Sequence, residues 1–380
     1  MTKIDFIYFD AGGGHRSAAT ALKSVIEQQG RPWEIRLVNL QDVLDPLDVF
    51  RKVTGIRLQD IYNLMLAKGW TLGAAQGVRF MHAVIRLYHS PAVRLLIRHW
   101  DDTRPDLVVS LVPNFNRALC ESLRAALPAV PFVTVLTDLA DYPPHFWLEP
   151  QQQFVVCGSD KAVEQARVMG HTQDRIFRTS GMILRPRFYE PVNADRAAER
   201  VRLGLDPATP TGLVLFGGQG SRVMLEIAQR LDDTQLIFIC GRNAKLADRL
   251  RSLPTKAPRW VEGFTQEVPF FMHLADFFIG KPGPGSISEA VAMKLPVIVE
   301  RNAWTLPQER YNPDWVLERR AGLVLPNFRG IREAVTRMLG ALDEYRANVA
   351  KIENRAVFEI PEILSRILER TRLLERTPLD

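Results

Sequence analysis

Cysteine is scarce in this chain of 380 residues, which contains only Cys120, Cys157 and Cys240. The three lie far apart with no CxxC spacing, so the sequence indicates neither a disulfide framework nor a cysteine-based zinc site. Long apolar runs are also missing, and no stretch approaches the roughly 20 residues that a helix needs to cross a bilayer. The sequence therefore predicts a folded protein whose contact with any membrane is peripheral.

The charge balance favours an anionic partner. Net charge is +6 and the pI is near 9.3, which suits nucleic acid, an anionic lipid surface or a phosphorylated substrate. No nucleic-acid-binding motif is visible and the aromatic residues form no obvious stacking platform, so nucleic acid is not expected. Residues 1–10 are interrupted by Asp5 and are typical of a first strand rather than a signal peptide, which predicts a cytoplasmic protein.

Apolar runs alternate with helical patterns along the chain, as in a parallel sheet covered by helices. The runs lie at 6–9, 35–38, 107–111, 132–136, 154–156, 213–216, 236–239, 260–261, 277–279, 297–299 and 323–325. The sequence therefore predicts an α/β protein with two facing, Rossmann-like, doubly wound domains and a cleft between them. We expect the domains at 1–185 and 211–340, an interdomain linker rich in proline and arginine at 186–210, and C-terminal helices at 341–380 that can brace the first domain.

An insertion at 44–104 interrupts this alternation. Within 78–100, apolar residues alternate with Arg79, Arg86, Arg94 and Arg98. An arginine-rich amphipathic helix can lie in a layer of lipid headgroups, or it can pack on its own domain. Both interpretations stay open, and the first one predicts an anionic membrane surface as a partner.

Three glycine loops stand where a predicted strand gives way to a helix. They are Gly12-Gly13-Gly14, Gly217-Gly218-Gln219-Gly220-Ser221, and the stretch from Gly280 to Glu289 that contains Gly283, Gly285 and Ser286. Glycines let backbone approach a ligand, and a helix N-terminus offers unpaired N–H groups to an anion. One such loop would be weak evidence, because tight turns of this kind are common. Three of them predict a nucleotide-diphosphate site.

Two side chains in these loops suit chemistry. His15 follows three glycines, and histidine can accept a proton near neutral pH, so His15 is the candidate general base. The alternative is a hydrogen-bonded loop histidine with no catalytic role. Glu289, one turn into a predicted helix, can accept both hydroxyls of a ribose. The alternative is that its charge merely favours the first helical turn.

Several short segments resemble a known family in the same order along the chain. They are Gly12 to Arg16, Val135 to Leu139, Gly181 with Arg185 to Phe188, Gly263-Phe264, Lys281 to Glu289, and Gln308-Glu309 with Asn312. These segments are similar to the monogalactosyldiacylglycerol synthases and, more distantly, to the transferase that adds N-acetylglucosamine to the undecaprenyl intermediate of peptidoglycan synthesis. Both are family 28 glycosyltransferases, so the resemblance, which covers about residues 4 to 327, implies the GT-B fold.

The resemblance also implies roles for the matching residues. The Gly217 to Ser221 loop and Gly285-Ser286 would hold the donor diphosphate, Glu289 the ribose, and backbone around Phe264 the uracil. Gln308 and Glu309 would take hydroxyls of the transferred sugar, with Gly283 and Asn312 completing the donor set. Gly12, Gly13 and Gly14 would form the acceptor loop. Asp138, in the family's Thr-Asp motif, would orient His15 or the acceptor; alternatively, it caps a strand end.

Together these features predict an inverting glycosyltransferase that moves a hexose from a UDP-sugar to a lipid hydroxyl, on diacylglycerol or a related glycolipid, at the inner face of a membrane. His15 would remove the acceptor proton. Backbone amides and helix dipoles can stabilise the departing UDP without a divalent ion. The lack of an Asp-x-Asp motif agrees, so neither a metal nor another cofactor is expected.

Rival functions remain open. A UDP-sugar epimerase of the same fold would need no acceptor, and a non-enzymatic nucleotide- or lipid-binding protein would tolerate loss of His15. An NAD-dependent dehydrogenase is disfavoured, because no acidic residue clearly closes a strand about 20 residues after either N-terminal loop of a domain. The sugar loop, residues 306–312, departs from the plant pattern at Pro307, Arg310 and Tyr311, and the insertion is not closely alike. The resemblance therefore names neither the hexose nor the lipid.

Overall fold

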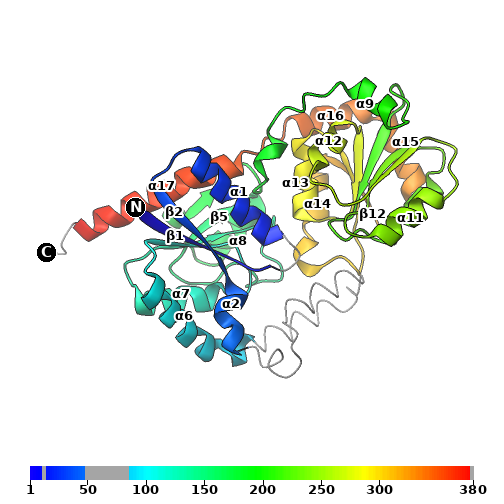
Figure 1. Ribbon diagram of the computed structural model, residues 1–380. Helices are drawn as coiled ribbons and strands as arrows, with labels where there is room; N and C mark the ends of the chain where they lie inside the picture. Colours follow the sequence, from blue (N-terminus) through cyan, green and yellow to red (C-terminus); the bar gives the residue numbers. More distant parts are fainter. Residues whose placement is uncertain (11–13, 48–84, 377–380) are drawn as a thin grey trace. The chain divides into compact units, whose positions relative to one another are not determined.

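The computed structural model of the chain describes residues 1–10, 14–47 and 85–376. Its contacts divide the chain into two compact units. The first comprises Met1–Pro186, Leu306–Gln308 and Asn354–Asp380, and the second comprises Arg187–Thr305 and Glu309–Glu353. Each unit contains one six-stranded sheet (Figure 1).

The first sheet is parallel throughout, in the order β2-β1-β3-β4-β5-β6. Its strands are β1 (Thr2–Tyr8), β2 (Trp33–Asn39), β3 (Leu107–Ser110), β4 (Phe132–Val135), β5 (Phe154–Cys157) and β6 (Ile176–Arg178). Strands β3, β4 and β5 are buried at every residue, as expected for parallel strands covered on both faces. The order reverses at β1, which lies between β2 and β3. Loops at the carboxyl ends of β1 and β3 therefore diverge there, which is where open α/β sheets bind ligands.

Helices cover both faces of the first sheet (Figure 1). They are α1 (Gly14–Gln28), α2 (Leu40–Leu44), α6 (His89–Thr103), α7 (Asn116–Ala126), α8 (Asp160–Val168) and α17 (Ala356–Arg376), with short 3-10 turns η1 (Asp45–Leu47) and η2 (Gln173–Arg175). Helix α17 packs beside α1, and the Arg31 guanidinium donates to Ser365 Oγ at 2.6 Å. The last helix of the chain is thus part of the first unit.

The second sheet is also parallel throughout, in the order β12-β11-β10-β7-β8-β9. Its strands are β7 (Thr211–Leu215), β8 (Gln235–Ile239), β9 (Arg259–Glu262), β10 (Phe277–Gly280), β11 (Val297–Glu300) and β12 (Gly322–Leu325). The order reverses between β7 and β10, so the loops that follow these two strands are neighbours at the carboxyl edge.

The helices of the second unit are α9 (Arg196–Arg202), α10 (Val223–Arg230), α11 (Ala244–Ser252), α12 (Val268–His273), α13 (Pro284–Ala292), α14 (Asn312–Glu318), α15 (Ile331–Gly340) and α16 (Leu342–Ala350), with 3-10 turn η5 (Phe328–Gly330). Two further 3-10 turns, η3 (Pro186–Phe188) and η4 (Pro307–Glu309), each contain residues of both units. One apolar core joins α10, α11 and α15 to the sheet through buried Phe238, Ile227 and Met338. The prediction of two doubly wound parallel α/β domains is confirmed.

Three segments differ in detail from the sequence analysis. Residues 186–210, expected to be a linker, include helix α9 and are counted with the second unit from Arg187 onward. Strand β6 was not predicted, because three residues are too short to give a pattern. Helix α13 begins at Pro284, so Glu289, expected one turn into the helix, lies beyond the first turn.

The insertion at 44–104 is described only in part, and Arg79 lies outside the described residues. Helix α6, at its end, buries Ala92, Leu96 and Trp100, and the Trp100 indole donates to Ser122 Oγ of α7 at 2.9 Å. The apolar face of this helix is thus used in ordinary packing. Arg86, Arg94 and Arg98 are exposed. Among the described helices, none is long and apolar enough to cross a membrane.

Candidate functional site

His15 lies in the first turn of α1, at the carboxyl edge of the first sheet. Its Nδ1 forms a hydrogen bond of 3.0 Å with Thr137 Oγ1, and its ring packs against Trp147 with centroids 5.8 Å apart. Thr137 follows β4, and β4 is a neighbour of β3 in the sheet. The histidine is therefore held at the point where three central strands end. Of the glycines before it, Gly14 begins α1, whereas Gly12 and Gly13 lie outside the described residues.

Burial lowers the pKa of His15 to about 4, although the backbone carbonyl of Leu111 favours the charged form. The imidazole is consequently neutral at physiological pH and able to accept a proton. The sequence analysis assigned His15 a proton affinity typical of neutral pH. The structure corrects this expectation, because the free site disfavours the imidazolium form.

Asp138 is buried at the same edge and acts on His15 through a third side chain. Its Oδ2 accepts a hydrogen bond of 2.8 Å from the Trp147 indole, and Trp147 is completely buried against His15. The Trp147 backbone is fixed in turn, because its N–H donates to Asp141 Oδ1 at 2.5 Å and its carbonyl accepts from Asn116 Nδ2 at 2.9 Å. Asp138 thus fixes the Trp147 side chain, against which the His15 ring packs.

Loop Gly217 to Ser221 connects β7 to α10 at the carboxyl edge of the second sheet. It is packed tightly against the loop after β8: Arg242 N–H donates to Gly218 O at 2.9 Å, and Asn243 Nδ2 donates to Gln219 O at 3.3 Å. Gly241 makes this possible. Its φ is +59°, and a Cβ there would lie 2.2 Å from Gly218 O. Only glycine allows the two loops to meet.

The third glycine loop leads from β10 into α13. Gly283 is the N-cap and contributes no side-chain hydrogen bond to the first turn, which contains Gly285 and Ser286. Amides of an uncapped first turn can bind an anion. Glu289 lies further along the same helix and is half-buried. This loop therefore has the form that the sequence analysis assigned to a diphosphate site.

The sugar loop is tied to the third glycine loop by two hydrogen bonds. Lys281 Nζ donates to Glu309 Oε1 at 2.8 Å, and Asn312 Nδ2 donates to Pro282 O at 2.7 Å. Glu309 and Asn312 are buried, whereas Gln308, beside Glu309 in η4, is half-buried. Asn312 is completely inaccessible, so it supports the loop from behind instead of contacting a ligand directly.

Phe264 lies just beyond the end of β9 and is 56% exposed. The Arg242 guanidinium covers its ring at 4.9 Å from the centroid. Because Arg242 is anchored to Gly218 through its backbone, the aromatic ring predicted at the uracil site is linked to the predicted diphosphate loop. A flat ring capped by a guanidinium can stack with a nucleobase.

Four residues at these edges had received no individual role from the sequence: Thr137, Trp147, Arg242 and Lys281. Thr137 and Lys281 belong to segments that carry the family resemblance. A lysine among loop glycines is typical of a phosphate-binding site, so the sequence did contain a signal for Lys281. Arg242 follows a glycine at a strand end, which is a weaker signal. Trp147 comes to His15 through a turn ten residues after Thr137, and no local pattern indicates it.

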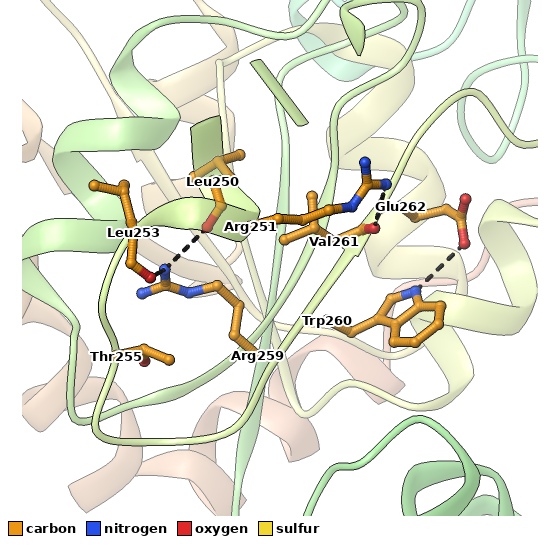
Figure 2. Close-up of a pocket in the computed structure, with 8 residues that line it drawn as sticks. All are labelled: Leu250, Arg251, Leu253, Thr255, Arg259, Trp260, Val261 and Glu262. Carbon is orange, nitrogen blue, oxygen red and sulfur yellow. Dashed lines mark hydrogen bonds between the residues drawn. The ribbon is translucent and has the colours of Figure 1, made fainter. Parts of the chain in front are cut away.

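A cavity of about 370 Å³ lies beside edge strand β9 (Figure 2). It is lined by Leu250, Arg251, Leu253, Thr255, Arg259, Trp260, Val261 and Glu262. Figure 2 shows that both arginines are directed to backbone carbonyls: Arg251 donates to Val261 O at 3.0 Å and Arg259 to Leu250 O at 3.3 Å. These cations support the β9 edge. Within the described part of the chain, no group of three or more His, Cys, Asp or Glu residues could hold a metal.

Comparison with known proteins connects these edges to a family. Residues 15–182 match the family model of monogalactosyldiacylglycerol (MGDG) synthase. A probable chloroplastic monogalactosyldiacylglycerol synthase 2 of Oryza sativa subsp. japonica is 27% identical over 395 aligned residues, covering 97% of this chain and 81% of that protein. The chain resembles the monogalactosyldiacylglycerol synthases along most of its length.

Solved structures share the fold of this chain. MurG of Acinetobacter baumannii superposes with a TM-score of 0.64 at 12% identity, covering 96% of this chain and 100% of that one. A Listeria monocytogenes protein described as a UDP-N-acetylglucosamine 2-epimerase gives a TM-score of 0.57 at 14% identity, covering 100% and 98%. The GT-B fold is therefore confirmed, and because transferase and epimerase share it, the fold alone does not choose the reaction.

Proposed function

We propose that this chain is an inverting, metal-independent glycosyltransferase that moves a hexose from a UDP-sugar to the hydroxyl of a lipid, diacylglycerol or a related glycolipid. The observation that carries the proposal is the similarity to plant monogalactosyldiacylglycerol synthases along 97% of the chain. The geometry supports it, since a neutral histidine lies at the edge of the first sheet, and the two glycine loops after neighbouring strands β7 and β10 lie at the edge of the second.

Each edge supplies one requirement of the transfer. His15, neutral at pH 7, accepts the proton of the acceptor hydroxyl, while Thr137 and Trp147 fix its ring. Glu289 binds the ribose, and Phe264 with the backbone beside it binds the uracil. The amides of Gly217 to Ser221 and of Gly285-Ser286 bind the diphosphate. Glu309 and Gln308 bind hydroxyls of the hexose.

An epimerase is the second candidate, because a UDP-N-acetylglucosamine 2-epimerase shares the fold. The two are separated by their need for an acceptor. We expect the purified protein to release UDP from one or a few UDP-hexoses only when a lipid extract is present, with a glycolipid as the second product. The same activity is expected in excess EDTA. UDP-sugar turnover without lipid would favour the epimerase, and activity lost with EDTA and restored by Mg²⁺ would contradict the metal-independent mechanism.

Replacement of Glu289 by alanine is expected to weaken UDP binding by about 1.5–3 kcal/mol, the range for hydrogen bonds to a charged group. Glu333→Ala provides a matched control, because Glu333 is an exposed carboxylate in the first turn of another helix of the same unit. Calorimetric titration with UDP measures both. If a folded Glu289→Ala protein binds UDP as the wild type does, the ribose lies elsewhere.

We also propose that the protein is cytoplasmic and binds the inner face of a membrane through charge. Exposed Arg86, Arg94 and Arg98 lie on or beside α6, whose apolar face packs in the first unit. Each arginine near an anionic surface should contribute about 1 kcal/mol, and the effect should fall with salt. Co-sedimentation of the triple Arg→Gln variant with anionic and neutral vesicles tests this. Equal binding of wild type and variant to both would contradict it.

A further inference from the structure

Lys281 belongs to the third glycine loop and lies close to both the Gly217 to Ser221 loop and Glu309 of the sugar loop. It follows β10 directly, and its Nζ is 2.8 Å from Glu309 Oε1 in the sugar loop. A Cβ at Gly283, the N-cap of α13, would lie 3.6 Å from the same Nζ, and a Cβ at Gly217 would lie 3.8 Å from Lys281 Cε. One ammonium group is therefore next to the sugar carboxylate, the start of a helix and the glycine loop after β7.

The surroundings of this lysine are suited to an anionic ligand. Gly217 and Gly283 have no side chains, so the space between the Lys281 side chain and the backbone of these two glycines is not filled by a Cβ. The uncapped first turn of α13 adds the positive end of a helix dipole. The Lys281 side chain is 39% exposed and Glu309 is 9% exposed, so the cation is the more accessible member of the pair.

We propose that Lys281 binds the donor diphosphate and stabilises the departing UDP, in the place where many transferases use a divalent cation. This inference rests on the proposed function. As the acceptor oxygen bonds to C1 of the hexose, the bond from C1 to the β-phosphate oxygen breaks, and both bonding electrons remain on that oxygen. The acceptor proton passes to His15. Lys281 keeps its proton and donates a hydrogen bond to the phosphate as its negative charge grows.

The pairing with Glu309 gives Lys281 a second effect. The ammonium orients the Glu309 carboxylate, which the proposed function places on hydroxyls of the hexose. Lys281 then holds the diphosphate and Glu309, paired with it, holds the hexose. A UDP-hexose is thereby positioned with its C1–O bond beside the Lys281 ammonium. The long, flexible lysine side chain can contact a phosphate oxygen while remaining near the carboxylate.

Binding of uridine, UMP and UDP to Lys281→Gln tests this proposal. Wild type should bind UDP more tightly than uridine. In the variant, UDP affinity should fall about tenfold or more, uridine affinity should change less than about twofold, and kcat should fall about 10- to 100-fold. Lys281→Arg, which keeps the charge, should recover part of the UDP affinity. Lys256→Gln is the matched control, because Lys256 is also paired with a carboxylate, Asp232 at 2.7 Å.

The outcomes separate this inference from the proposed function. If wild type binds neither UDP nor uridine, the proposed function fails. If wild type prefers UDP and the glutamine variant keeps that preference, the function stands and the role of Lys281 is overturned. Equal weakening of UDP and uridine would assign Lys281 a purely structural role, and it would also overturn the proposal. Unfolding curves of the arginine variant show whether any loss reflects folding.

Discussion

Replacement of His15 by alanine is expected to lower the transfer rate by about 10²–10⁴-fold while leaving UDP affinity unchanged, because general-base assistance is worth that much and His15 does not belong to the unit that contains the proposed nucleotide loops. Single-turnover rates at saturating donor and lipid, with UDP titration alongside, measure the two quantities. A variant with near-normal turnover would move the base elsewhere, and Asp138 would be the next residue to change.

Thr137→Val provides a control for the position of the ring. It removes the hydroxyl that bonds His15 Nδ1 at 3.0 Å but keeps the side-chain shape. We expect a smaller loss than for His15→Ala, because the imidazole remains and Trp147 still packs against it. A loss as large as that of the alanine variant would show that the orientation of the ring, and not only its presence, limits the rate.

The depressed pKa of His15 predicts the pH dependence. The neutral, active form persists as pH falls until the value of about 4 is approached, so the acid limb of kcat/KM should lie well below neutrality. The folded protein resists protonating this group, whereas the unfolded chain accepts a proton near 6.5. Its contribution to stability is therefore full above 6.5 and is lost as pH falls towards 4. His15→Gln should lose less stability than wild type across that window.

Replacement of Asp276 by alanine is expected to destabilise the second unit by about 3–5 kcal/mol, the cost of removing one partner from a buried ion pair. Asp276 is 5% exposed and precedes β10. Its Oδ2 accepts from Arg200 Nη2 at 2.6 Å and from Thr211 N at 2.8 Å, while its Oδ1 accepts from Arg196 Nη2 at 2.7 Å. Arg346 of α16 binds it as well. Loss of the carboxylate leaves Arg200, itself buried, without that charge.

Denaturant unfolding of Asp276→Ala and of Asp160→Ala separates buried from exposed pairs. Asp160 bonds Arg178 at the surface, with 67% and 46% of the side chains exposed, and its loss should cost at most about 1 kcal/mol. Burial would raise the pKa of Asp276, but its hydrogen bonds with Arg196 and Thr211 lower it overall. The Asp276 contribution is thus present above pH 4 and lost below. Equal costs for both variants at pH 7 would contradict the assigned role.

The fold was readable from sequence where physical signals are long and repeated. Parallel strands buried on both faces appear as apolar runs, and the runs near Leu107, Phe132, Leu213 and Phe277 all became strands. Strand β6 has only three residues, and its register is set by pairing with β5, so no local sequence pattern predicts this strand. Helix α9 is fixed by Arg200 and Asp276, residues 76 positions apart. A contact between residues so far apart in the sequence cannot be predicted from the pattern of neighbouring residues.

The candidate site divides in the same way. Glycine loops identify strand ends that can bind phosphate, because a positive φ and close approach of backbone demand that residue type. They do not reveal which side chain enters the loop, so Lys281 was quoted but given no role. The pKa of His15 depends on burial and on the backbone carbonyl of Leu111, which only the fold supplies. The sequence was sufficient to propose His15 as the base, but the direction of its pKa shift could be obtained only from the structure.

The most direct test of the central claim follows the anomeric carbon through the reaction. Purified protein is incubated with diacylglycerol and a UDP-hexose labelled with ¹³C at C1, and the products are resolved by NMR and mass spectrometry. The account predicts one UDP released for each hexose attached to lipid, with the configuration at C1 inverted from α in the donor to β in the glycolipid. A labelled hexose that stays on UDP as an epimer, or a lipid product that retains the α configuration, would contradict it.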